Sequence, residues 1–237
     1  MSVSPSCALI SLDREESAPH ESLSALRVFL QEQGVRVLDN PNPQQALDAD
    51  MMILAGVSSP VECYERLKAL DYERILGRRV AGSRPVLGVQ HTGYIFFEDL
   101  QIEDPALGSV TISGMGEWPG TVTTLGDSVD ARTELLLQAE KSAESARVPA
   151  GSRFVPVVSE SGNYAVLEWE FDQSIESMVP PQVSWVAPAG ENAEENERLL
   201  VVENGPLSAF LADPTGTESA RAFIVSWLSS VKATGRI

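Results

Sequence analysis

Short apolar runs alternate with amphipathic segments through the first hundred residues of the chain. The runs are continuous in their apolar character, which is typical of strands buried on both faces of a parallel sheet. We expect strands at 7–12, 35–38, 51–57 and 85–89. Apolar residues at helical spacing predict helices over 22–33 and 60–80, and a further helix from about Tyr94 to Glu98. This order predicts an α/β fold with a mostly parallel central sheet flanked by helices.

The second half of the chain has a different pattern. Partly alternating stretches predict antiparallel strands at 121–124, 154–158, 164–171 and 183–186. Asn204-Gly205 lies between two further apolar runs, 199–202 and 207–211, and predicts a β-hairpin. We expect a helix over 130–145, an exposed loop at 191–197 and a last helix over 217–231, capped by Thr217. No repeat, low-complexity tract or linker interrupts the pattern, so a single domain over residues 1–237 is expected.

Composition narrows the classes of partner. The chain has 237 residues, of which 43% are hydrophobic and 22% charged, as in ordinary globular proteins. Its net charge of −17 would repel phosphate backbones and anionic lipids, so we expect neither nucleic acid nor membrane as a partner. The acidic excess serves solubility or, alternatively, docks a basic partner. No secretory signal is recognisable near Met1, and the cytoplasm is the expected location.

The two cysteines, Cys7 and Cys63, are too few for a metal cluster or a disulfide framework, and both are expected to be buried structural residues. No group of candidate ligands has a recognisable metal spacing. We therefore expect neither a metal nor a cofactor.

The segment Arg84-Pro85-Val86-Leu87-Gly88-Val89-Gln90-His91-Thr92-Gly93 predicts a buried strand, a tight turn and then a helix. An α/β hydrolytic enzyme places its nucleophile at the apex of such a turn. The apex residue here is Gln90, whose amide has no ionisable nucleophilic atom.

Four segments, in order along the chain, carry a resemblance that covers nearly its whole length. They are 53–58, 84–98, 114–122 (Gly-Met-Gly-Glu-Trp-Pro-Gly-Thr-Val) and 203–215. Together they resemble the class I glutamine amidotransferase domain, and most closely the glutaminase subunits of imidazole glycerol phosphate synthases. The resemblance implies a flavodoxin-like amidotransferase fold.

The resemblance also implies that the catalytic residues of the family are replaced. The family's cysteine position is Gln90, and the histidine and glutamate positions of its late His-Pro-Glu segment are Asp213 and Thr215. Its mechanism needs a thiolate that attacks the amide of glutamine and an imidazole that transfers the proton. In addition, Thr92 stands where the family has glycine, and Tyr94 stands where it has a substrate-binding glutamine.

These replacements predict a catalytically inactive amidotransferase-like protein that acts as a partner subunit, a scaffold or a regulatory binding module. The expected partner is a synthase-like subunit, or a second copy in a homo-oligomer. Two alternatives remain, a hydrolase or lyase with a refitted site at the carboxyl edge of the sheet and a small-molecule sensor. The candidate pocket residues at that edge are Gly56, Val57, Ser58, His20, His91, Thr92 and Tyr94.

Overall fold

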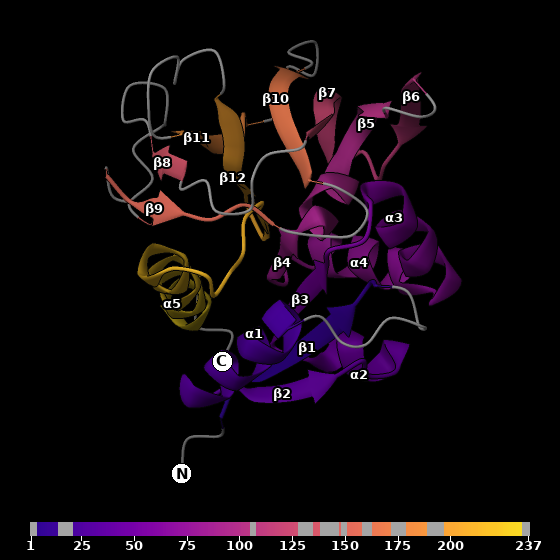
Figure 1. Cartoon of the computed structure of the whole chain (residues 1–237). Helices are drawn as coiled ribbons and strands as arrows, with labels where there is room; N and C mark the ends of the chain where they lie inside the picture. Colours follow the sequence, from indigo (N-terminus) through magenta and orange to yellow (C-terminus); the bar gives the residue numbers. More distant parts are fainter. Residues whose placement is uncertain are drawn as a thin grey trace.

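A computed structural model describes the chain at residues 4–13, 21–104, 108–127, 135–137, 147, 151–157, 163–171, 179–188 and 197–233. Within these residues the strands form one larger and one smaller sheet (Figure 1). The α/β fold class expected from the sequence is confirmed.

The larger sheet has the strand order β2-β1-β3-β4-β13-β12-β11-β8-β9. Its strands are β1 (Ser6–Ser11), β2 (Arg36–Asp39), β3 (Met51–Gly56), β4 (Val86–Gln90), β8 (Leu135–Leu137), β9 (Arg153–Phe154), β11 (Gln182–Pro188), β12 (Arg198–Asn204) and β13 (Leu207–Phe210). Pairing is parallel from β2 to β13 and antiparallel beyond it. The predicted hairpin at Asn204-Gly205 is the β12–β13 connection, and it places β13 beside β4.

The smaller sheet has the strand order β10-β7-β5-β6. Its strands are β5 (Phe97–Asp104), β6 (Gly108–Ser113), β7 (Trp118–Asp127) and β10 (Asn163–Phe171). β5 pairs with β7 in parallel, whereas the other two pairs are antiparallel. The expected antiparallel pairing is confirmed for β7 with β10, whereas β7 also pairs in parallel with β5, a strand that the sequence did not lead us to expect.

Helices cover both faces of the larger sheet. They are α1 (Glu21–Glu32), α2 (Pro43–Asp48), α3 (Pro60–Ala69), α4 (Tyr72–Ala81) and α5 (Glu218–Ala233). Cys7 and Leu9 of β1 belong to the core that α1 and α5 cover, and Ala8 and Ile10 belong to the core that α3 and α4 cover. Burial of both strand faces explains why these strands are continuously apolar in the sequence.

The starts of α2 and α3 follow from local sequence. Asn42 and Ser59 each cap the helix that follows, and the side chains of Gln45 and Glu62 accept hydrogen bonds from the backbone N–H of the capping residue. Each capping residue is followed by proline, whose fixed φ suits the first helical position. The sequence analysis did not predict α2, although Asn-Pro-x-Gln is a signal that indicates such a helix.

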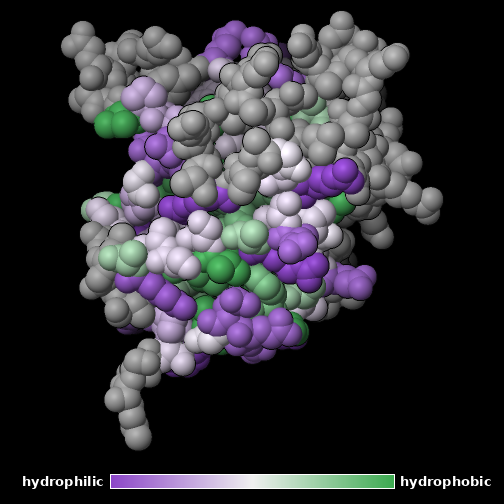
Figure 2. Space-filling model, turned by 90° about the vertical axis from the view of Figure 1, so that its left-hand side faces the viewer, coloured by the Kyte–Doolittle hydropathy of each residue, from purple (hydrophilic) through white to green (hydrophobic). Residues whose placement is uncertain are grey.

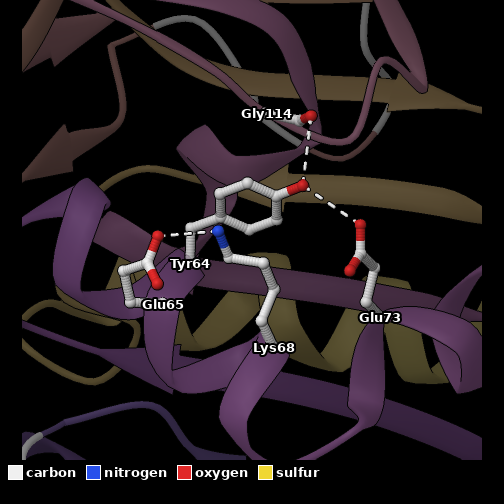
Figure 3. Close-up of polar contacts among 5 residues, drawn as sticks. All are labelled: Tyr64, Glu65, Lys68, Glu73 and Gly114. Atoms are coloured by element: carbon white, nitrogen blue, oxygen red, sulfur yellow. Dashed lines mark hydrogen bonds and ion pairs between the residues drawn. The ribbon is translucent and has the colours of Figure 1, made fainter.

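The prediction of one continuous helix over 60–80 is wrong, because the chain turns in the middle of this segment. The chain forms two helices, α3 and α4, and turns between them at Asp71, which has a left-handed φ of 58°. The Tyr64 hydroxyl of α3 lies 3.1 Å from Glu73 Oε1 of α4 and 3.3 Å from the Gly114 carbonyl oxygen (Figure 3). This contact ties both helices to the segment that connects β6 and β7.

Two further helix predictions need correction. The segment from Tyr94 to Glu98 does not begin an α-helix, because a 3₁₀ helix, η1 (His91–Phe96), is followed at once by β5. All six residues of η1 are buried, so no polar face is available for a surface helix. The helix predicted over 130–145 is a strand, β8, at 135–137, and the rest of that segment lies outside the described residues. Of the loop predicted at 191–197, residues 191–196 also lie outside them. Likewise, the strand expected over 154–158 is limited to β9.

The surface of the described residues is predominantly polar. Its exposed large hydrophobic side chains are four valines, Val28, Val61, Val179 and Val225. Figure 2 shows one side of the molecule, where hydrophilic side chains surround a small hydrophobic group. None of the helices in the described part of the chain combines the length and the apolar character that crossing a membrane requires.

Candidate functional site

The turn after β4 keeps the backbone shape of a nucleophile elbow. Gln90 has φ 60° and ψ −138°, a conformation that costs a residue with a side chain about 1–3 kcal/mol. Two glycines allow η1 to pack tightly against β4 and against β13 with the residue that follows it. A Cβ on Gly88 would lie 2.7 Å from Phe96 Cε2, and a Cβ on Gly93 would lie 2.6 Å from Leu211 Cδ2. The surrounding packing therefore holds the strained turn in place.

The side chain at the apex of this elbow is enclosed. Gln90 is 2% exposed, and its Nε2 donates a hydrogen bond to Ser22 Oγ at 2.6 Å. Ser22 is itself buried, in the first turn of α1. The amide of Gln90 thus satisfies one of its polar groups inside the protein and presents almost no surface to a substrate.

His91 is held next to Gln90 by the loop that follows β3. Its Nδ1 lies 2.9 Å from the Val57 carbonyl oxygen and 3.0 Å from that of Ser58. Because carbonyl oxygens only accept hydrogen bonds, Nδ1 carries the proton and Nε2 is the free acceptor of the neutral ring. Burial lowers the pKa of His91 to about 4, although hydrogen bonds to the two carbonyls oppose this effect. The ring is therefore neutral at physiological pH.

The Nε2 atom of His91 is buried and has no hydrogen-bond partner among the described residues. Aromatic rings surround the imidazole. The edge of the Tyr164 ring packs at a centroid distance of 5.1 Å, and the Tyr94 ring lies at 6.0 Å. His91 therefore fills space between the elbow and the smaller sheet.

The backbone amides that follow β3 bond the carboxyl group of Asp13, which follows β1. Asp13 Oδ1 accepts hydrogen bonds from Val57 N at 2.7 Å and Ser58 N at 3.0 Å, and it lies 3.2 Å from Ser58 Oγ. The segment 53–58 resembles the oxyanion strand of class I glutamine amidotransferases, whose amides would face a developing oxyanion. In this chain Asp13 occupies those donors at Val57 and Ser58.

Thr92 and Tyr94 complete the filling of the elbow. Thr92 is buried, and its Oγ1 lies 2.8 Å from the Leu54 carbonyl oxygen and 2.7 Å from that of Val89. Its methyl carbon would lie 3.2 Å from a Cβ placed on Gly56. Tyr94 is 1% exposed and donates a hydrogen bond to the Tyr164 carbonyl oxygen at 2.8 Å, and burial raises the pKa of its hydroxyl. Thr92 and Tyr94 therefore act as packing residues.

The late segment places Asp213 and Thr215 in a turn that leads into α5. Asp213 Oδ1 accepts hydrogen bonds from Thr215 N at 2.9 Å and Gly216 N at 3.1 Å, and it lies 3.2 Å from Thr215 Oγ1. Thr217 then caps α5, as predicted, by accepting a hydrogen bond from Ala220 N at 3.1 Å. One carboxylate oxygen of Asp213 is therefore engaged in its own loop, in an Asx turn.

The structure brings most of the candidate pocket residues together. Val57, Ser58 and His91 are joined by hydrogen bonds, Gly56 lies against Thr92, and Tyr94 lies beside His91. His20 lies outside the described residues. The described part of the chain contains no group of three or more histidine, cysteine, aspartate or glutamate side chains placed to hold a metal ion.

Two residues at the centre of the site were not assigned a contact by sequence reasoning. The sequence predicts Ser22 only as the start of a helix, and it indicates no contact for Asp13. No local pattern marks either contact, because Ser22 bonds a residue 68 positions away and Asp13 bonds residues 44 and 45 positions away.

Comparison with known proteins gives relatives along most of the chain. No protein-family model matches it. The imidazole glycerol phosphate synthase subunit HisH of Renibacterium salmoninarum is 34% identical over 216 residues, which cover 90% of this chain and 91% of that protein. The subunit HisH of Nocardia farcinica is 33% identical over 209 residues, covering 84% and 88% respectively.

Solved structures with a similar fold include PurLQS and a glutamine amidotransferase, both from Thermotoga maritima. The PurLQS chain has a TM-score of 0.58 at 11% identity and covers 97% of this chain and 100% of its own length. The glutamine amidotransferase has a TM-score of 0.51 at 10% identity, with coverages of 99% and 86%. These similarities concern the fold, whereas the sequence relatives establish the family. The chain belongs to the family of imidazole glycerol phosphate synthase HisH subunits and has the class I glutamine amidotransferase fold.

Proposed function

We propose that the chain is a catalytically inactive member of its family, which acts as a partner subunit, a scaffold or a regulatory binding module in the cytoplasm. The observation that carries this proposal is the state of Gln90. It occupies the apex of the elbow, has no ionisable group, and is enclosed by a hydrogen bond to Ser22. A nucleophile must be ionisable and within reach of its substrate, and Gln90 meets neither requirement.

The groups that would assist a nucleophile are also committed to other contacts. Asp213 bonds the backbone of its own turn, and the amides of Val57 and Ser58 bond Asp13. Loss of one member of a catalytic triad already lowers the rate of a hydrolase by orders of magnitude. Together these contacts support a site that contributes to stability and no longer to catalysis.

The polar contacts of Asp13 and Ser22 come from the two ends of the connection between β1 and α1. Asp13 follows β1 and Ser22 lies in the first turn of α1, so one end of this connection supplies a group to the amides after β3 and the other supplies a group to Gln90. These two contacts support the proposal that the site is closed.

The proposed partner follows from the relatives. Those proteins are named as subunits of imidazole glycerol phosphate synthase. A chain that keeps the family fold and has lost the catalytic groups can retain the surface through which such a subunit binds its synthase. The net charge of −17 favours a partner that presents basic groups.

One observation favours the second candidate, an enzyme of different chemistry. The unpartnered Nε2 of neutral His91 is a potential proton acceptor. However, His91 is only 1% exposed, so a substrate reaches it only if η1 or the adjacent tyrosines move. We therefore retain the inactive subunit as the better-supported function.

The test measures glutamate released from glutamine by the purified chain, alone and mixed with the synthase partner of its own organism. We expect no release above background, and no difference between the wild-type chain and Gln90→Ala. The HisH subunit of Renibacterium salmoninarum with its own synthase partner is the positive control. Glutamine hydrolysis that disappears in Gln90→Ala or Asp213→Ala would contradict the proposal.

Binding is measured in parallel by co-elution of the chain with the synthase partner. A screen of hydrolase and lyase substrates with wild type and His91→Ala distinguishes the second candidate, because only that candidate predicts an activity that this substitution abolishes.

A further inference from the structure

The outer strand of the smaller sheet has an open edge. β6 pairs with β5 along its whole length, from Asp99↔Ser113 to Asp104↔Gly108, and this register has no bulge. In the strand order β6 is terminal, and it lies at the margin of the molecule (Figure 1). Among the described residues, no backbone hydrogen bond joins β6 to any element other than β5. Alternate N–H and C=O groups of the strand therefore point away from the sheet.

This edge lacks the features that usually prevent strands from pairing with other chains. Natural edge strands carry charges, proline or bulges that oppose such pairing. β6 has the sequence Gly-Ser-Val-Thr-Ile-Ser, with no charge and no proline, and the whole segment 105–115 has no charged residue. Val110, Thr111 and Ile112 are residue types that favour extended structure.

We infer that the free edge of β6 pairs in antiparallel fashion with β6 of a second copy of this chain, and so joins two smaller sheets into one. The electrostatics select this occupant. Each copy carries a net charge of −17, so two copies approach most easily through an uncharged surface, whereas a basic partner is drawn to the acidic surface instead. An antiparallel pair of identical strands is also symmetric by construction, as a two-fold dimer requires.

The pattern of side chains selects the register. Val110 and Ile112 are half-buried on one face of β6, and Ser109, Thr111 and Ser113 are exposed on the other. A two-fold axis at Thr111 places Val110 opposite Ile112 of the second copy and the two Thr111 side chains opposite each other. A shift by one residue would place apolar side chains opposite polar ones and reverse one sheet relative to the other.

The size of the contact predicts a weak association. A pair of six-residue strands buries much less than the roughly 1,200 Å² of a stable interface. Repulsion between the two acidic copies opposes the contact further and is screened by salt. We therefore expect a reversible dimer that becomes more populated as protein concentration and ionic strength rise.

Sedimentation velocity of the full chain over a wide concentration range tests the dimer, at about 0.05 M and 0.5 M salt. We expect a monomer–dimer equilibrium that shifts toward dimer at the higher salt. Thr111→Lys should restore the monomer, because two like charges would face each other across the symmetry axis. Thr123→Lys is the matched control, since Thr123 lies on β7 in the same cross-strand row as Gln101 and Thr111. It should leave the dimer intact.

Cysteine cross-linking tests the register. Under mild oxidation Thr111→Cys should form a disulfide-linked dimer much faster than Thr123→Cys, because opposed Cβ atoms at the axis lie close to disulfide distance. Native thiols contribute little background, since Cys7 and Cys63 are fully buried and burial raises the pKa of both. A monomer at every concentration and salt overturns the inference, as does equal cross-linking at the two positions or a dimer that Thr111→Lys does not weaken. Because none of these readouts involves glutamine, failure here is separate from failure of the proposed function.

Discussion

At the scale of single residues, the elbow after β4 is held by buried polar contacts. Gln90 has the left-handed φ of 60° that the turn imposes, and its side chain makes a buried hydrogen bond to Ser22. Its neighbour His91 is also buried, with one nitrogen bonded to two carbonyls and the other without a hydrogen-bond partner in the described part of the chain. Because burial keeps this imidazole neutral, the stability of the fold depends on pH.

We predict that His91 makes the fold less stable as pH falls. Its pKa is about 4 in the folded chain, against an ordinary value of 6.5, so the unfolded chain binds a proton first between these pH values. The free energy of unfolding should therefore fall by about 2 kcal/mol from pH 7 to pH 5 through this residue. Urea denaturation of wild type and His91→Gln at both pH values checks this. An equal loss of stability in the two proteins would contradict the prediction.

At the scale of elements, a buried arginine connects α4 to the end of α2. Arg79 is fully buried, and its guanidinium donates hydrogen bonds to the carbonyl oxygens of Ala46, Ala49 and Pro85 at 2.9, 2.8 and 3.1 Å. Burial lowers its pKa to about 10, so it remains charged at neutral pH. Carbonyl groups at the end of a helix lack hydrogen-bond donors within the helix, and Arg79 provides such donors. The sequence did not indicate this contact, because arginine is normally a surface residue.

Arg79→Met should destabilise the chain by at least about 3 kcal/mol, because it leaves several buried carbonyl groups without donors. The adjacent Arg78 is exposed on the same helix, and Arg78→Met is the matched control, with an expected change within about 0.5 kcal/mol. Urea denaturation at pH 7 measures both. Similar losses for the two variants would show that the carbonyl contacts of Arg79 contribute little.

At the scale of the whole molecule, the family fold places a filled elbow at one edge of the larger sheet. The order of strands β1, β3, β4 and β13 brings the ends of four elements to one edge of the sheet, as a ligand site would require. Asp13, which follows β1, and side chains from α1 and η1 then occupy that edge. Under the proposed function, activity would therefore require more than a change of Gln90, Asp213 and Thr215.

We predict that the triple variant Gln90→Cys, Asp213→His, Thr215→Glu does not hydrolyse glutamine at a measurable rate. Asp13 would still occupy the amides of Val57 and Ser58, and Thr92 would still fill the elbow. Glutamate release in the presence of the synthase partner measures the outcome, and circular dichroism confirms that the variant is folded. Efficient turnover would show that Asp13 and Thr92 do not close the site.

The sequence by itself determined the family and the parallel strands, and the proposed loss of catalytic groups rests on its residue types at positions 90, 213 and 215. Continuous apolar runs specify strands buried on both faces, and the residue types Gln90, Asp213 and Thr215 exclude thiolate and imidazole chemistry there. Sequence periodicity failed where tertiary packing decided the conformation, as at Asp71 and in η1.

Only the tertiary structure decided which contacts Gln90, Asp13 and Arg79 make. The hydrogen bonds of Gln90 with Ser22, of Asp13 with Val57 and of Arg79 with Ala46 join residues 68, 44 and 33 positions apart. Such contacts depend on how strands and helices pack, and local sequence patterns carry no record of them. The sequence therefore determined that the apex of the elbow carries an amide, and the packing of β1 and α1 against β3 and β4 decided that the elbow is closed.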